Sequence, residues 1–169
     1  ESRIYELSQV EKVPSEAPFQ VPFRHLCNLL LIHQGDVERV LQEFPPLTAE
    51  QEALIRQRAN CAWYWIEECA PEDFRFAVRR PGEKAELSDA ETNAIRRLRD
   101  EVVANLDSFA DEKFVAEAIY KAAQDSGVDS KTMFKAAYQA LIGKDQGPRL
   151  AGFLKTLGKD KVLDILSVY

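Results

Sequence analysis

A short basic turn holds the residues of this chain that are best suited to binding chemistry. Lys144 and Arg149 lie between Gly143, which we expect to end one helix in the left-handed conformation, and the start of another helix. Pro148 is expected to take the first position of that second helix, where its missing N–H is not needed. Free backbone N–H groups and two cations would then share one corner, which suits an anion or the edge of a base. The simpler alternative is a solvated loop with ordinary surface cations.

Side chains on either side of this turn extend the candidate site. Further cations precede and follow it, namely Lys131, Lys135, Lys155 and Lys159. Unpaired RNA bases commonly stack on aromatic or arginine faces. Phe134 and Phe153 lie on apolar stripes, so we expect them in the core. Tyr138 lies nearer the edge of its stripe and is the better stacking candidate.

Catalytic and metal-binding patterns are not found in the sequence. It has neither a phosphate-binding glycine loop nor a dinucleotide-binding glycine motif. His25 and His33 would lie about 12 Å apart along one helix, too far for a shared ion. The three cysteines have no zinc-like spacing. We therefore expect no catalytic residue and no metal ligand in this chain.

Composition and charge narrow the class of protein. The 169 residues are 46% hydrophobic and 30% charged, which is typical of a globular chain. A net charge of −6 argues against tight binding along a DNA duplex, although residues 129–169 carry seven Lys or Arg against four Asp. The longest apolar run, Leu29–Ile32, is too short for a membrane span. The odd number of cysteines favours the reducing environment of the cytoplasm. Because the sequence starts at Glu1 rather than Met, we expect it to be a piece of a longer polypeptide.

Apolar spacing and capping residues predict helices almost throughout. We expect helices from Pro22 to Gly35, from Asp36 to Phe44, from Thr48 to about Ala70, from Ser88 past Leu106, from Asp111 to Gly127, from Ser130 past Leu141, and over about 148–157 and 159–167. Thr48 with Gln51 and Ser88 with Glu91 match the capping-box pattern. Inward positions are predicted to include Phe114 and Phe134. Residues 74–87 are predicted to form an irregular crossing segment.

The predicted fold is therefore all-α, a bundle of about seven to eight helices in two stacked subdomains. Residues 1–20 are predicted to form a linker or entry segment, residues 21–87 a first helical subdomain, and residues 88–169 a second one. The basic turn belongs to the second subdomain. A helical bundle without catalytic motifs also fits a protein–protein interaction module, which we keep as the alternative.

Three separated segments resemble one protein family. They are the turn and helix over 143–159, Arg3-Ile4-Tyr5-Glu6-Leu7-Ser8, and Gln20-Val21-Pro22-Phe23-Arg24-His25-Leu26. Together they resemble the C-terminal anticodon-binding domain of class I lysyl-tRNA synthetases and, more loosely, the related glutamyl enzymes. The two N-terminal segments favour the lysyl version.

The resemblance implies a function in which this chain does no chemistry itself. It would bind the uridine-rich anticodon loop of a lysine tRNA through Arg149, Lys144, Lys135, Lys131, Lys155 and Tyr138. Arg24 would contact the RNA or form a structural ion pair. A catalytic domain of the same polypeptide would use ATP and lysine, while this part would bind neither, nor DNA, nor a membrane.

Overall fold

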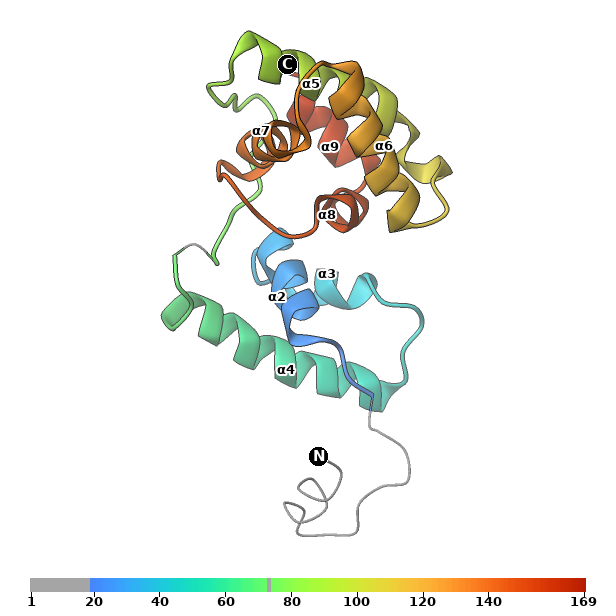
Figure 1. Cartoon of the computed structure of the whole chain (residues 1–169). Coiled ribbons are helices and arrows are strands. Elements are labelled where there is room, and N and C mark those ends of the chain that lie inside the picture. Colours follow the sequence, from blue (N-terminus) through green and yellow to red (C-terminus); the bar gives the residue numbers. More distant parts are fainter. Residues whose placement is uncertain (1–18, 73) are drawn as a thin grey trace, which may run out of the picture.

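A computed structural model describes residues 19–72 and 74–169 of the chain. All regular elements in these residues are helices, so the all-α prediction is confirmed. The eight α-helices of the described residues form two lobes that face each other across the loop before α8 (Leu150–Leu157) and the start of α2 (Phe23–Ile32) (Figure 1). The segment from Arg3 to Ser8 and most of the predicted linker lie outside the described residues. No helix among the described residues is long and apolar enough to cross a bilayer.

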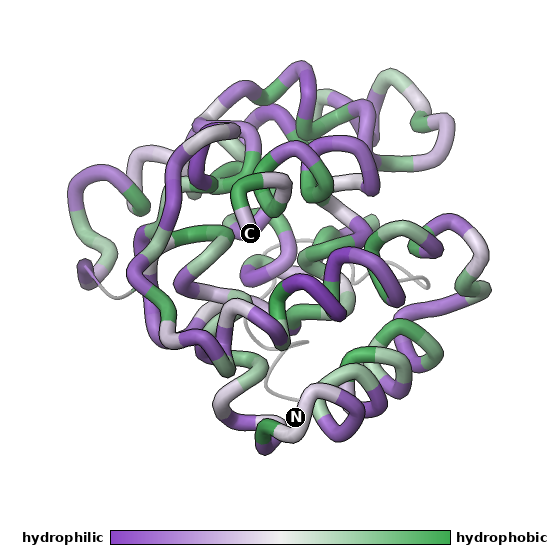
Figure 2. Tube along the Cα trace, turned by 90° about the horizontal axis from the view of Figure 1, so that it is seen from above, coloured by the Kyte–Doolittle hydropathy of each residue, from purple (hydrophilic) through white to green (hydrophobic). Residues whose placement is uncertain are grey.

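The first lobe consists of three helices that enclose their own core. α2 and α3 (Val37–Gln42) pack against the long α4 (Ala49–Glu68). α4 begins with the predicted capping box, because Thr48 accepts a hydrogen bond from the backbone N–H of Gln51 and the Gln51 side chain accepts one from Thr48. Leu26, Leu30 and Ile55 are almost completely buried between these helices. A single apolar stripe on α4 is sufficient because its other side faces solvent (Figure 2).

The second lobe is larger and carries the basic turn. It contains α5 (Asp89–Arg97), a π turn over Leu98–Val102, a 3₁₀ segment over Val103–Ser108, α6 (Glu112–Asp125), α7 (Ser130–Ile142), α8 and α9 (Lys159–Leu166). Ser88 and Glu91 form the second capping box, and Asp111 caps α6 as predicted. Core side chains from all of these segments meet in one cluster.

Three local predictions are wrong, each for a physical reason. The helix capped by Ser88 is α-helical only to Arg97, and a π turn over Leu98–Val102 follows, after which Val102 and Val103 are both buried. The cap of α7 is Asp129 rather than Ser130, since the Asp129 carboxylate accepts from the Thr132 N–H at 2.6 Å. Pro148 lies outside α8, which begins at Leu150 with Arg149 in the cap position.

The inward-facing assignments of two phenylalanines also need correction. Phe114 is 48% exposed. Phe134 is half-buried and packs edge-on against Tyr120, with ring centroids 5.6 Å apart. Both positions satisfy helical spacing, but they lie at the border of the stripe rather than at its centre, so packing leaves them partly in solvent.

The segment between the two lobes follows an irregular path, as predicted, and packs mainly against the second lobe. Val78 and Ala85 are buried in the second core, and Phe76 lies edge-on to Phe153 of α8 at 5.6 Å between centroids. Ile32 at the end of α2 also belongs to that core. The subdomain boundary at residue 87 stays a prediction.

Tyr169 fixes the later part of this connecting segment. Its buried hydroxyl accepts a hydrogen bond from the backbone N–H of Ala85 at 2.6 Å, and its carbonyl accepts one from Arg96. The ring is 5% exposed. Through these contacts the end of the described chain holds residues 80–87 against the second lobe.

Replacement of Tyr169 by Phe should therefore lower stability. The change leaves the Ala85 N–H buried without its partner, which costs about 1–3 kcal/mol. Urea denaturation followed by circular dichroism measures this free energy of unfolding. Tyr64→Phe is the control. Tyr64 is 67% exposed, so the loss of its hydroxyl should leave the free energy of unfolding unchanged. Equal stability of Y169F and Y64F would contradict the anchoring role.

Candidate nucleic-acid interface

A cleft of about 850 Å³ opens between the two lobes. One wall comes from α2, the other from α8 and the loop before it, and the aromatic residues of the connecting segment close the back. Phe74, Phe76 and Phe153 line its apolar part. Its polar lining comprises Arg24, His25, Asn28, Glu112, Gln146, Arg149 and Thr156. Apolar faces beside exposed cations are the combination that binds unpaired nucleotides.

Two arginines from distant parts of the sequence meet at this cleft. Arg24 lies in the first turn of α2 and lines the cleft together with Asn28, one turn further along the helix. Arg149 is the cap residue of α8. Both side chains are exposed, and neither forms an ion pair with another described residue. Two guanidinium groups are thus free to pair with phosphates or stack on bases.

The loop that carries Arg149 is held in a defined shape at its beginning. Gly143 ends α7 with φ at 69°, as the sequence predicts. Arg79 of the connecting segment binds the end of α7 twice, through its N–H to the Leu141 carbonyl at 2.8 Å and through Nε to the Gln139 carbonyl at 3.0 Å. The Leu141 carbonyl gains a partner in this way, and the Gln139 carbonyl also accepts from the Gly143 N–H at 3.2 Å.

Tyr138 holds the other end of the same loop from inside the protein. It is 8% exposed, its ring lies under Gly147, and its hydroxyl donates a hydrogen bond to the Pro148 carbonyl. A Cβ on residue 147 would come within 2.9 Å of this ring. Burial raises the pKa of the Tyr138 phenol, so the hydroxyl keeps its proton and acts as a donor. The predicted role as a stacking face for RNA does not fit this burial.

Lys144 and Lys135 lie at the same corner and have partners within the protein. The Lys144 ammonium donates to the Glu72 carbonyl at 2.6 Å, so it links the loop to the end of the first lobe. Lys135 is 3.5 Å from the Asp145 carboxylate. A hydrogen bond from Gln139 and the nearby Lys135 charge lower the pKa of the Asp145 carboxyl. Lys144 is not among the residues that line the cleft, whereas Arg149 is.

The remaining predicted cations are not brought to the cleft. Lys155 points to the other side of α8, where its ammonium donates to the Phe109 carbonyl at 3.0 Å. Lys131 is exposed in the first turn of α7. Neither lines the cleft. Of the predicted RNA-binding residues, only Arg24 and Arg149 share it.

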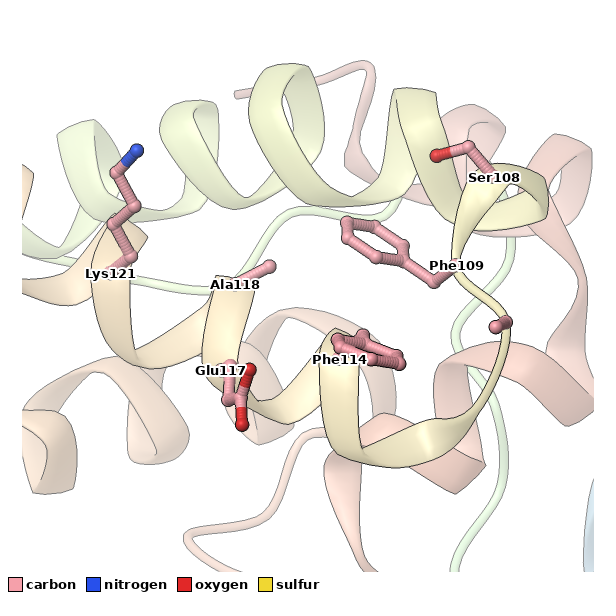
Figure 3. Close-up of a pocket in the computed structure, with 7 residues that line it drawn as sticks. Ser108, Phe109, Phe114, Glu117, Ala118 and Lys121 are labelled. Atoms are coloured by element: carbon pink, nitrogen blue, oxygen red, sulfur yellow. The ribbon is translucent and has the colours of Figure 1, made fainter.

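A second, apolar hollow of about 560 Å³ lies where the 3₁₀ segment leads into α6. Phe109 and Phe114 form its walls, and Glu117 and Lys121 project from α6 at its border (Figure 3). It is the surface that a protein-interaction module would use. Its polar side chains are Ser108, Glu117 and Lys121.

The structure also bears on metal-binding clusters and on the buried cysteine Cys27. No group of three or more His, Cys, Asp or Glu side chains comes together there in a way that could hold an ion. Burial raises the pKa of the Cys27 thiol to about 11, which keeps it protonated and unreactive near neutral pH.

Several residues of the cleft were not predicted from the sequence. Asn28, Glu112 and Gln146 have no motif around them, and Glu112 comes from a helix remote from the basic turn. Gln146 was part of the turn but was not singled out. The crossing of Phe76 onto α8 is what creates the cleft, and irregular segments have no periodicity from which such a crossing is readable.

Comparison with known proteins identifies the family of the chain. Residues 70–167 match the anticodon binding domain family. The chain is 45% identical to the lysine–tRNA ligase of Treponema pallidum (strain Nichols), over 99% of this chain and 32% of the relative. It is 35% identical to the lysine–tRNA ligase of Borreliella burgdorferi, again over 99% of this chain and 32% of the relative. Its identity to that of Methanopyrus kandleri is 33%, over 96% of this chain and 32% of the relative.

These matches and the cleft define a helical tRNA-binding domain. The chain belongs to the anticodon binding domain family, since that family accounts for more than half of its residues. It spans about a third of the length of the lysine–tRNA ligases that it matches. The predicted resemblance to the anticodon-binding part of lysyl-tRNA synthetases is confirmed.

The burial of Tyr138 can be tested by comparing two substitutions. Tyr138→Phe removes only the bond to the Pro148 carbonyl and should cost about 1 kcal/mol of stability. Tyr138→Ala also empties the space under Gly147 and should cost about 3–5 kcal/mol. Chemical denaturation measures both. A stacking face on the RNA would behave differently: Y138A would weaken tRNA binding and leave the unfolding midpoint unchanged.

Proposed function

We propose that this chain is the anticodon-binding domain of a class I lysine–tRNA ligase and that it holds the anticodon loop of lysine tRNA in the cleft between α2 and α8. The observation that carries the proposal is the convergence of Arg24 and Arg149 on one cleft with an aromatic back wall. The names of the relatives supply lysine as the amino acid.

The physical basis is a division between affinity and selectivity. The two arginines attract the phosphates of the loop, and the apolar back of the cleft accepts unstacked bases at about 1–3 kcal/mol per base. Wrong bases would leave polar groups of the cleft without partners, which costs more than a missing favourable contact. The rigid loop over 143–149 limits the entropy lost on binding.

In this proposal the domain contributes binding energy and no chemistry. The catalytic domain lies in the remaining polypeptide, uses ATP and lysine, and attaches the amino acid to the other end of the same tRNA. The domain itself binds neither small molecule. We also place the protein in the cytoplasm, in keeping with three cysteines that form no disulfide with one another.

Loss of either cleft arginine should weaken tRNA binding without weakening the fold. Because hydrogen bonds to charged groups contribute about 1.5–3 kcal/mol, Arg149→Ala and Arg24→Ala should each raise the Kd for lysine tRNA about tenfold or more. Fluorescence anisotropy with labelled tRNA measures this. Arg80→Ala is the matched control, because Arg80 is exposed and lies outside the cleft. Three equal Kd values would exclude the cleft as the binding site.

The selectivity of the domain should depend on the anticodon. Lysine tRNA should bind more tightly than the same tRNA with a substituted anticodon, by about 1–3 kcal/mol for each base that is read. The slope of log Kd against log salt concentration should be shallow, since few phosphates are contacted. Competition titrations at two salt concentrations measure both quantities. Equal affinity for both tRNAs would reject anticodon recognition.

A further inference from the structure

Two arginines of the connecting segment bind the ends of two helices that belong to different lobes. Arg75 donates through Nε and Nη2 to the Ala70 carbonyl, at 3.2 and 2.9 Å, just past the end of α4. Arg79 binds the end of α7, with its backbone N–H on the Leu141 carbonyl and its Nε on the Gln139 carbonyl. Neither helix has a basic residue in its own last turn. Since a positive charge is favourable at the carboxyl end of a helix, the connecting segment supplies to both helices a cation that they lack.

The residues between these arginines form the back of the cleft. Phe74 and Phe76 line the cleft and alternate in sequence with Arg75, which binds the first lobe. Arg79 follows three residues after Phe76 and binds the second lobe. The aromatic back of the cleft is thus connected, over a few residues, to the end of α7, where the loop over 143–149 begins.

A third cation joins the connecting segment to the same loop from the opposite direction. The Lys144 ammonium donates to the Glu72 carbonyl at 2.6 Å. The Arg79 guanidinium lies against Gly143, with Nη2 at 3.1 Å from the position that a Cβ of residue 143 would occupy. Neither Arg79 nor Lys144 lines the cleft. Both therefore contact the first two residues of the loop that carries Arg149, and they do so from outside the cleft.

We propose that Arg79 and Lys144 are positioning residues for tRNA binding, which hold the loop over 143–149 so that Arg149 stays at the cleft. Without either contact the start of the loop is free to move, and ordering it on binding consumes part of the interaction energy. The contribution of both residues to affinity passes through Arg149 and disappears when Arg149 is absent. This inference rests on the proposed function, because it explains how one arginine of the proposed site is held in place.

The test is a double-mutant cycle on the Kd for lysine tRNA. Arg79→Met and Lys144→Met keep an apolar side chain and remove the hydrogen-bond donors. Each should raise the Kd about fivefold in the chain with Arg149, and less than about twofold in Arg149→Ala, because coupled residues act non-additively. Fluorescence anisotropy measures the Kd, at a temperature where thermal melts show that every variant is folded.

Two substitutions in the connecting segment are the matched controls. Arg75→Met removes a side-chain bond to a backbone carbonyl, as Arg79→Met does, but this carbonyl belongs to the first lobe. Any change in Kd caused by R75M should therefore have the same size with and without Arg149. Arg80→Met removes an exposed charge outside the cleft and should change the Kd less than about twofold in both backgrounds.

The possible results separate the inference from the proposed function. Loss of the R79M and K144M effects in R149A, with an equal R75M effect in both backgrounds, supports the inference. It is overturned if R79M or K144M leaves the Kd unchanged, or changes it by the same factor in both backgrounds, as a direct RNA contact or a general loss of stability would. The proposed function then still stands on the weaker binding of R149A and R24A. Binding of R149A and R24A as tight as that of the unsubstituted chain overturns both.

Discussion

The attachment of the 143–149 loop to both lobes is the constraint on which the rest of the site depends. Arg79 binds the end of α7, Tyr138 holds Pro148, and Lys144 reaches the Glu72 carbonyl of the first lobe. A free loop of this length would sample many conformations, and ordering it on binding would consume part of the interaction energy. Here the order is present before a ligand arrives, so Arg149 is already directed to the cleft.

The same contacts explain why the two lobes form one cleft. The first lobe has its own core around α2 and α4, and the second has a larger one. Phe76 packs against both, and its edge-on contact with Phe153 brings α8 opposite α2. The aromatic back of the cleft is therefore also a packing contact between the lobes.

Local features of the fold could be predicted from the sequence, but the site could not be predicted completely. Capping residues such as Thr48 and Ser88 act on backbone within three residues, so their effect is readable from spacing alone. The π turn at Leu98 and the burial of Tyr138 depend on neighbours remote in sequence, and spacing carries no information on them.

The basic turn illustrates both sides of this limit. Its two cations were correctly recognised as neighbours in sequence, and the left-handed Gly143 was predicted from its position. The sequence did not indicate which of the two cations lines the cleft. Lys144 donates a hydrogen bond to the Glu72 carbonyl of the first lobe, whereas Arg149 lines the cleft. Residue type indicated the chemistry, and tertiary contacts decided which cation is available for it.

The acidic character of the chain is compatible with RNA binding when charge is considered at the scale of the cleft. At physiological ionic strength, exposed charges beyond about 8 Å are largely screened, so the net charge of −6 acts weakly on a bound loop. In the proposed complex Arg24 and Arg149 would act at contact distance, and the acidic body would oppose adhesion to other nucleic acid along extended surfaces. When the non-specific attraction for RNA is weak, the difference in binding energy between right and wrong bases is a larger share of the total. A recognition domain can then discriminate between tRNAs.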